Sequence, residues 1–99
     1  AKEVTIQIVI EKENIDETFT FNTDHEFLTD LIKEKQDELG ASFESSDFGT
    51  MIIGMKGYEA DISKNEFFLI QINGEDAMAG TDDTPIQDGD EYRFVLSTW

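Results

Sequence analysis

The chain has 99 residues, of which 38% are hydrophobic and one is Pro, and this length and apolar content suit one folded domain over residues 1–99. Its 23 acidic and 7 basic side chains give a formal net charge of −16, so we expect neither nucleic acid nor an anionic lipid surface as a partner, because both would be repelled. The absence of Cys excludes disulfides, cysteine-ligated metal centres and thiol nucleophiles.

No segment approaches the ~20 apolar residues of a membrane span, and none has the apolar core of a signal peptide. We therefore expect no direct membrane insertion by this sequence. Because the chain begins with Ala1 rather than Met, we expect a trimmed fragment, with any export signal upstream of it.

The first predicted elements are two strands of a hairpin. Residues 4–10 alternate between apolar and mainly polar side chains, which is typical of a strand with one apolar face. The polar segment 12–17 predicts the connecting loop. Residues 18–21 alternate again and place both of their Phe side chains on one face.

A single amphipathic helix is predicted over residues 24–39, where apolar side chains recur at helical spacing. Thr23 and Glu26 have the spacing of a capping box, and Gly40 predicts the C-terminal stop. His25 is the only histidine and falls in the first turn, where we expect an exposed side chain without the partners of a catalytic or zinc site.

Three further strands are predicted in the second half of the chain. Residues 41–49 suit a loop, and 51–55 suit a strand in which Gly54 either weakens the pairing or marks a bulge. The nearly continuous apolar run 66–72 suits a central strand, and 91–99 is the last strand.

Glycine-containing turns separate these strands. Asn73-Gly74 favours a type I′ hairpin turn because both central positions need positive φ. Residues 57–61 and Asp88-Gly89-Asp90 predict turns, and 80–85 predict a loop.

The resulting order, β-β-α-β-β-β, predicts an α+β fold of the β-grasp type, the ubiquitin-like roll. In this fold a mixed sheet carries one helix packed on one face. We expect the first and last strands to pair in parallel at the sheet centre, because that is the simplest arrangement with a right-handed crossover.

Several short motifs resemble the transcobalamin C-terminal-like β-grasp domain family. They are Phe48 to Gly57, Phe68 to Glu75, Ala79-Gly80, Gln87 to Asp90 and the helical stretch His25 to Ile32. The bacterial branch of this family occurs in surface proteins and lipoproteins, largely of Gram-positive bacteria. The resemblance therefore implies a binding role at the cell surface or outside the cell.

In the animal vitamin B12 carriers of this family, the domain closes over cobalamin beside a larger helical domain. This sequence contains no such helical domain. The family often has Trp where Phe68 stands here, so this chain keeps the aromatic bulk and lacks the indole donor. The resemblance thus implies a ligand without naming it.

The aromatic and Met residues that the core explains least are candidates for ligand contact. Trp99 lies on the less apolar face of the last strand, away from the predicted helix; it could also simply cover a strand end. Tyr58, Met55 and Met78 lie near turns. The predicted ligand-binding set is Tyr58, Phe68, Asn73, Met78 and Trp99. Phe68 and Asn73 are included because they belong to the family motif. The primary role of Asn73 is expected to be backbone geometry.

The carboxylates could form a hard-cation site only if six to eight oxygens converged. Asp82-Asp83 and the run Asp88 to Glu91 lack the spacing of an EF-hand loop, and a tight turn before a strand explains the second run more simply. We predict no metal site, no cofactor and no catalytic residues.

These observations predict a non-enzymatic, extracytoplasmic binding or display module of a bacterial surface protein or lipoprotein. Its ligand would be a small hydrophobic or corrinoid molecule, or another protein. One alternative is a structural spacer in a larger surface protein. Another is a ubiquitin-like or sulfur-carrier protein, which is disfavoured because the sequence ends Leu96-Ser97-Thr98-Trp99 and not Gly-Gly.

Overall fold

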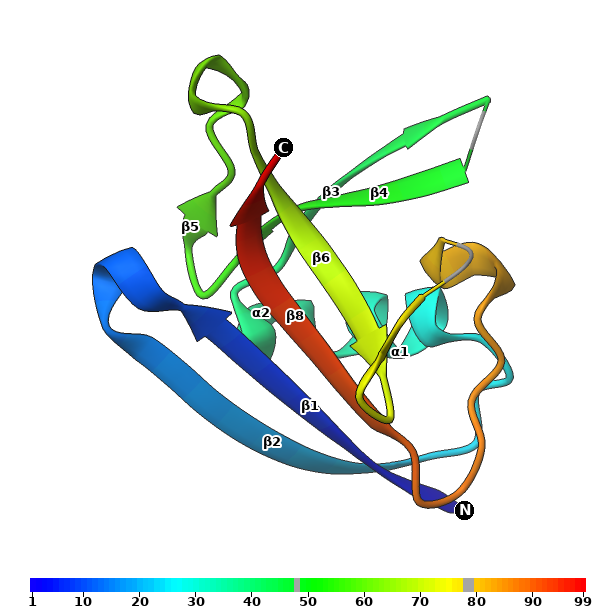
Figure 1. The fold of residues 1–99 in the computed structure, drawn as a ribbon. Helices are drawn as coiled ribbons and strands as arrows, with labels where there is room; N and C mark the ends of the chain where they lie inside the picture. Colours follow the sequence, from blue (N-terminus) through cyan, green and yellow to red (C-terminus); the bar gives the residue numbers. More distant parts are fainter. Residues whose placement is uncertain (48, 78–79) are drawn as a thin grey trace.

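The computed structural model describes residues 1–47, 49–77 and 80–99 and shows a small mixed α/β fold that consists mostly of strands (Figure 1). The strands are β1 (Lys2–Ile10), β2 (Ile15–Thr23), β3 (Ser42–Ser46), β4 (Gly49–Met55), β5 (Tyr58–Glu59), β6 (Glu66–Ile72), β7 (Glu75–Asp76) and β8 (Glu91–Thr98). The helices are α1 (Leu28–Glu34) and α2 (Gln36–Leu39), and the 3-10 turns are η1 (Glu11–Glu13), η2 (Ile62–Lys64) and η3 (Thr81–Asp83).

The larger sheet is mixed and has five strands in the order β2-β1-β8-β6-β7. β1 pairs antiparallel with β2 and parallel with β8, with Thr5 opposite Glu91 and Val9 opposite Val95. The predicted parallel pairing of the first and last strands is therefore confirmed. The start of β1 and the end of β8 lie at opposite ends of this sheet (Figure 1).

The core lies between this sheet and the helices. The alternation in β1 buries every second side chain, and α1 and α2 contribute the opposing apolar stripe; each fully buried Val, Ile or Leu contributes about 1.5–3 kcal/mol. Tyr92 and Phe94 of β8 are also buried. The fully buried aliphatic side chains of this core are Val4, Ile6, Ile8, Ile10, Leu28, Leu31, Ile32 and Leu39.

The predicted helix over residues 24–39 is shorter in the structure and divided in two. Phe27 forms a β-bridge with Pro85, and the Leu28 amide donates to the Thr84 carbonyl, so the segment before Leu28 is extended. Thr23 is the last residue of β2 and its hydroxyl accepts from the His25 amide. The capping-box prediction was wrong because strand pairing and the bridge hold this segment outside the helix.

The smaller sheet has three strands in the order β3-β4-β5, and β3 corrects the prediction of a loop over residues 41–49. Ser42 lies opposite Gly54 and Phe43 opposite Ile52, so the register skips Ile53 in a bulge. A Cβ at Gly54 would lie 2.9 Å from the Tyr58 carbonyl oxygen. The glycine thus marks a bulge, one of its two predicted meanings, and permits close approach of β5.

The Asn73-Gly74 turn was predicted correctly. Asn73 has φ 51°, Gly74 has φ 87°, and the flanking residues Ile72 and Glu75 pair directly. The loop predicted over residues 12–17 is shorter in the structure, since β2 begins at Ile15 after a left-handed Asn14 with φ 56°.

Candidate functional site

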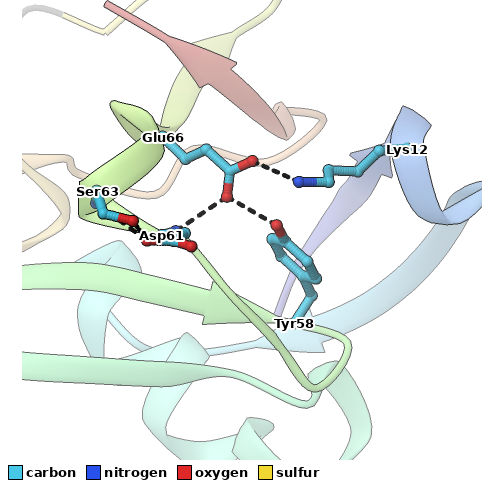
Figure 2. Close-up of polar contacts among 5 residues, drawn as sticks. All are labelled: Lys12, Tyr58, Asp61, Ser63 and Glu66. Carbon is cyan, nitrogen blue, oxygen red and sulfur yellow. Dashed lines mark hydrogen bonds and ion pairs between the residues drawn. The ribbon is translucent and has the colours of Figure 1, made fainter.

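A buried carboxylate lies where the two sheets meet. Glu66 is the first residue of β6 and is 5% exposed. Its carboxylate accepts hydrogen bonds from Lys12 Nζ at 2.8 Å, Tyr58 Oη at 2.7 Å and the Asp61 amide at 2.9 Å (Figure 2). The cluster therefore joins η1, β5 and β6.

These donors stabilise the ionised form of the carboxylate. The hydrogen bond from Lys12, followed by those from Tyr58 and the Asp61 amide, lowers the pKa of Glu66 from 4.5 to about 2. The same contact with Glu66 raises the pKa of Lys12 above its ordinary value. Both groups are thus charged at neutral pH, and the pair is neutral as a whole.

An apolar groove lies next to this cluster, between β4, residues 59–62 and β6, with a volume of about 380 Å³. Three of the side chains that line it are large, apolar and exposed: Met51 by 65%, Ile62 by 76% and Phe67 by 36%. Trp99, 66% exposed, extends this surface because its ring centroid lies 6.2 Å from that of Phe67.

The charged side chains on the groove wall are acidic. Glu44 and Glu59 are exposed, and neither forms an ion pair with any residue in the described ranges. A second groove, of about 230 Å³, shares Met51, Ile52 and Phe68 with the first. The two grooves therefore adjoin each other beside β4 and β6.

The structure brings some of the predicted ligand-binding residues to this region. Phe68 is 7% exposed and lines both grooves. Tyr58 donates to Glu66 behind the groove wall, and Trp99 adjoins Phe67. Met78 lies outside the described residues.

Asn73 lies at the other end of β6, away from this group, and its side chain fixes the start of β8. Its Nδ2 donates to Asp90 Oδ1 at 3.0 Å, and its Oδ1 accepts from the Glu91 amide at 2.9 Å. Asp90 also accepts from the Gln87 amide and from Tyr92 Oη. Burial is the main cause that raises the pKa of Tyr92, and the hydrogen bond to Asp90 is the second cause.

The carboxylates considered for calcium take part in local hydrogen bonds. Asp82 accepts from the Thr50 amide at 2.7 Å, and Asp88 accepts from the Glu3 amide at 2.7 Å. Within residues 1–47, 49–77 and 80–99, no three or more His, Asp or Glu side chains gather as a metal ion would require.

Sequence reasoning missed Glu66 and the three exposed groove residues. A carboxylate beginning an apolar strand is a signal for a buried ion pair, and an isolated Ile62 between polar residues is a signal for a surface contact. The adjacent Phe67-Phe68 pair must also place one ring on each face of its strand, because side chains alternate. No sequence pattern indicated that these residues meet.

None of the helices in the described part of the chain has the length and apolar character needed to cross a membrane.

A comparison with curated proteins found no match. Among solved structures, the chain is similar to a crystal structure from Ruminococcus gnavus, named as a candidate metal-binding protein. The two are 26% identical with a TM-score of 0.90, and the match covers 100% of this chain and 99% of that one.

The chain is also similar in fold to haptocorrin, whose structure was determined in complex with Cbi. The TM-score is 0.84 at 14% identity, and the match covers 99% of this chain and 25% of that one. This chain therefore spans about a quarter of the length of haptocorrin. Residues 26–98 match the family described as a domain of unknown function, DUF4430, and the chain belongs to this family.

Proposed function

We propose that this chain is a non-enzymatic binding module, displayed outside the cell in a bacterial surface protein or lipoprotein, which holds an apolar ligand in the groove between β4 and β6. The observation that carries the proposal is the gathering of Met51, Ile62 and Phe67 around one groove on a highly acidic molecule. Contiguous exposed apolar surface commonly marks a binding site.

The ligand class of this proposal is a small hydrophobic molecule, a corrinoid or an apolar segment of another protein. Support for a corrinoid comes from the fold shared with part of haptocorrin, which binds the corrinoid Cbi. The extracellular location is proposed from the resemblance to the transcobalamin C-terminal-like family, whose bacterial branch occurs in surface proteins and lipoproteins. Phe68 takes the family's Trp position and lines the groove without an indole donor.

The name of the similar Ruminococcus gnavus structure suggests metal binding as another candidate function for this chain. The described residues do not fit it, because no set of three ligands converges and Asp82, Asp88 and Asp90 accept hydrogen bonds from backbone amides. We therefore assign no step of the function to a metal.

We further propose that the arrangement is a single module with a β-grasp variant, in which a second small sheet follows the helices. The parallel pairing of β1 with β8 supports this class. A structural spacer remains the rival function, because a spacer needs no groove ligand.

The test titrates cobinamide, cobalamin and the neutral apolar dye Nile red into the protein. Trp99 is the only Trp and contacts Phe67 at the groove, so its emission reports on binding, with free N-acetyltryptophanamide as the control for light absorption by the corrinoids. Calorimetry on the same samples gives the dissociation constants.

Ile62→Ser is the groove variant and Lys64→Ser is its matched control on the same turn. Loss of the Ile62 side chain is expected to weaken binding by about tenfold, from about 1.4 kcal/mol of lost apolar contact, and the control is expected to change it little. If none of the three probes binds, a small-molecule ligand is excluded, and if the peptides tested below do not bind either, the binding proposal is wrong and the spacer stands.

A further inference from the structure

On the edge of β6 that faces away from β8, no residue among 1–47, 49–77 and 80–99 bonds to the backbone of Phe68. The Glu66 amide donates to the Asp61 carbonyl at 3.1 Å, and the Ile70 carbonyl accepts from the Ala77 amide at 2.8 Å. Both bonds lie on the side away from β8. Because backbone direction alternates with period two, the N–H and C=O of Phe68 point to the same side, and no residue in the described ranges bonds to either.

The apolar groove lies at this same edge. Phe67 and Phe68 both line it, although adjacent side chains of a strand point to opposite faces of the sheet. A groove lined by both must therefore reach the strand edge between them. The open backbone of Phe68 and the apolar groove thus form one surface.

Charge on this surface favours a cation. Glu66 is neutralised by Lys12 at 2.8 Å, which leaves Glu44 and Glu59 as the unpaired charges among the described groove residues. The whole chain adds a net charge of −16, so a positively charged partner is attracted and an anionic one repelled.

We propose that the free edge of β6 binds an extended basic peptide segment of a partner protein as an added strand. The peptide backbone pairs with the N–H and C=O of Phe68, an apolar side chain enters the groove, and a neighbouring Lys or Arg faces Glu44 or Glu59. Two adjoining grooves share Phe68, so an extended chain that pairs with this residue can place side chains in both. This inference rests on the proposed binding function and names its partner class.

The probe is the capped peptide acetyl-Lys-Val-Phe-Val-Lys-amide, followed by amide NMR on the ¹⁵N-labelled protein. Strand addition is expected to slow hydrogen exchange at the Phe68 amide, because a buried backbone bond replaces water there. An analogue with a methyl group on the central peptide nitrogen loses a donor and is expected to bind about tenfold more weakly.

The variant Glu44→Gln/Glu59→Gln tests the charge. It is expected to weaken binding of the basic peptide by about two- to tenfold at low salt. The control Glu13→Gln/Glu38→Gln removes the same charge from two exposed carboxylates elsewhere and is expected to leave binding nearly unchanged. The same peptide with Glu in place of both Lys residues is expected not to bind.

Three results would overturn the inference. In the first, the basic peptide binds without slowing exchange at Phe68, and the methylated analogue binds equally well. In the second, the acidic peptide binds as well as the basic one. In the third, no peptide binds while Nile red or a corrinoid does, and the proposed function then survives without a peptide partner. If nothing binds at all, both proposals fail.

Discussion

At the scale of single residues, Glu66 shows how a buried charge is tolerated between two sheets. Removing one partner of a buried ion pair is costly because the remaining charge is left uncompensated. Here the carboxylate has three donors from three separate segments (Figure 2). The cluster therefore fixes the position of β5 relative to β6, and with it the width of the groove beside them.

The first prediction concerns acid stability. The pKa of Glu66 is lowered in the folded chain to about 2, so its contribution to stability is complete above its unfolded pKa of about 4.5 and is lost as the pH falls from about 5 to 2. Glu66→Gln is expected to lower stability at pH 7 and to flatten the loss of stability across that window. Urea unfolding at a series of pH values measures this, and Glu13→Gln, at an exposed carboxylate, should retain the wild-type slope. An equally steep slope in Glu66→Gln would show that other carboxylates govern acid unfolding.

The second prediction separates the hydroxyl of Tyr58 from its ring. Tyr58→Phe removes the 2.7 Å hydrogen bond to Glu66 but keeps the ring over which Lys12 Nζ lies, 5.3 Å from the centroid. We expect the melting temperature to fall by several degrees, because Glu66 keeps its charge with one donor fewer. Differential scanning calorimetry measures this. Tyr58→Leu should cost more, since it also removes the cation–π contact, and equal losses in the two variants would contradict this account.

At the scale of elements, close backbone approach decides which glycines are required. Gly40 ends α2 with φ 59°, and a Cβ there would lie 2.8 Å from both the Lys56 Cα and the Gly57 amide nitrogen. Gly74 has φ 87° in the β6–β7 turn, and a Cβ there would meet nothing within 4 Å. Both positions have a left-handed backbone that would strain a residue with a side chain. Only at Gly40 would the added Cβ also clash with neighbouring backbone atoms.

The third prediction follows from that difference. Gly74→Ala is expected to cost about 1 kcal/mol of unfolding free energy from the left-handed conformation. Gly40→Ala is expected to cost about 3 kcal/mol or more, because backbone atoms must also move. Chemical denaturation of both variants gives the comparison. Equal losses would mean that α2 and the β4–β5 turn separate without cost.

The sequence predicted the elements whose own pattern decides their structure. The alternation of apolar and polar residues predicted β1, the apolar run predicted β6, and Asn73-Gly74 predicted the hairpin turn between β6 and β7. It failed where tertiary pairing overrides local preference: the bridge from Phe27 to Pro85 holds back the start of α1, and β3, a mostly polar strand, exists through its pairing with β4. The groove was not predictable for the same reason, since Met51, Ile62 and Phe67 come from separate segments.

At the scale of the whole molecule, the few basic residues are concentrated on aromatic rings. Among the described residues, four of the seven basic side chains lie over rings, with Nζ 5.3 to 5.7 Å from the ring centroid. Lys56 lies over Phe19 and also pairs with Glu17 at 3.1 Å. These lysines therefore pack against aromatic rings. The acidic side chains elsewhere on the surface greatly outnumber the remaining basic ones and repel one another.

The fourth prediction is that salt stabilises the fold. The Debye length is about 30 Å at 0.01 M salt and about 8 Å at 0.15 M, whereas the radius of gyration is 12.6 Å, so at low salt the acidic charges act across the whole molecule. We expect the melting temperature to rise by a few degrees between these two NaCl concentrations. Glu13→Lys should raise it at low salt and have less effect at high salt. A melting temperature that falls with NaCl would show that ion pairs such as Lys12–Glu66 outweigh the repulsion.

The parallel ladder between β1 and β8 also determines how the molecule responds to mechanical load. Because these adjacent strands run in the same direction and lead to opposite poles, tension applied at Ala1 and Trp99 pulls one strand past the other. The interstrand bonds are then strained together in shear and cannot open one after another like a zipper. A module with this connectivity resists stretching along the line between its two ends, which is a property that the proposed display function would require.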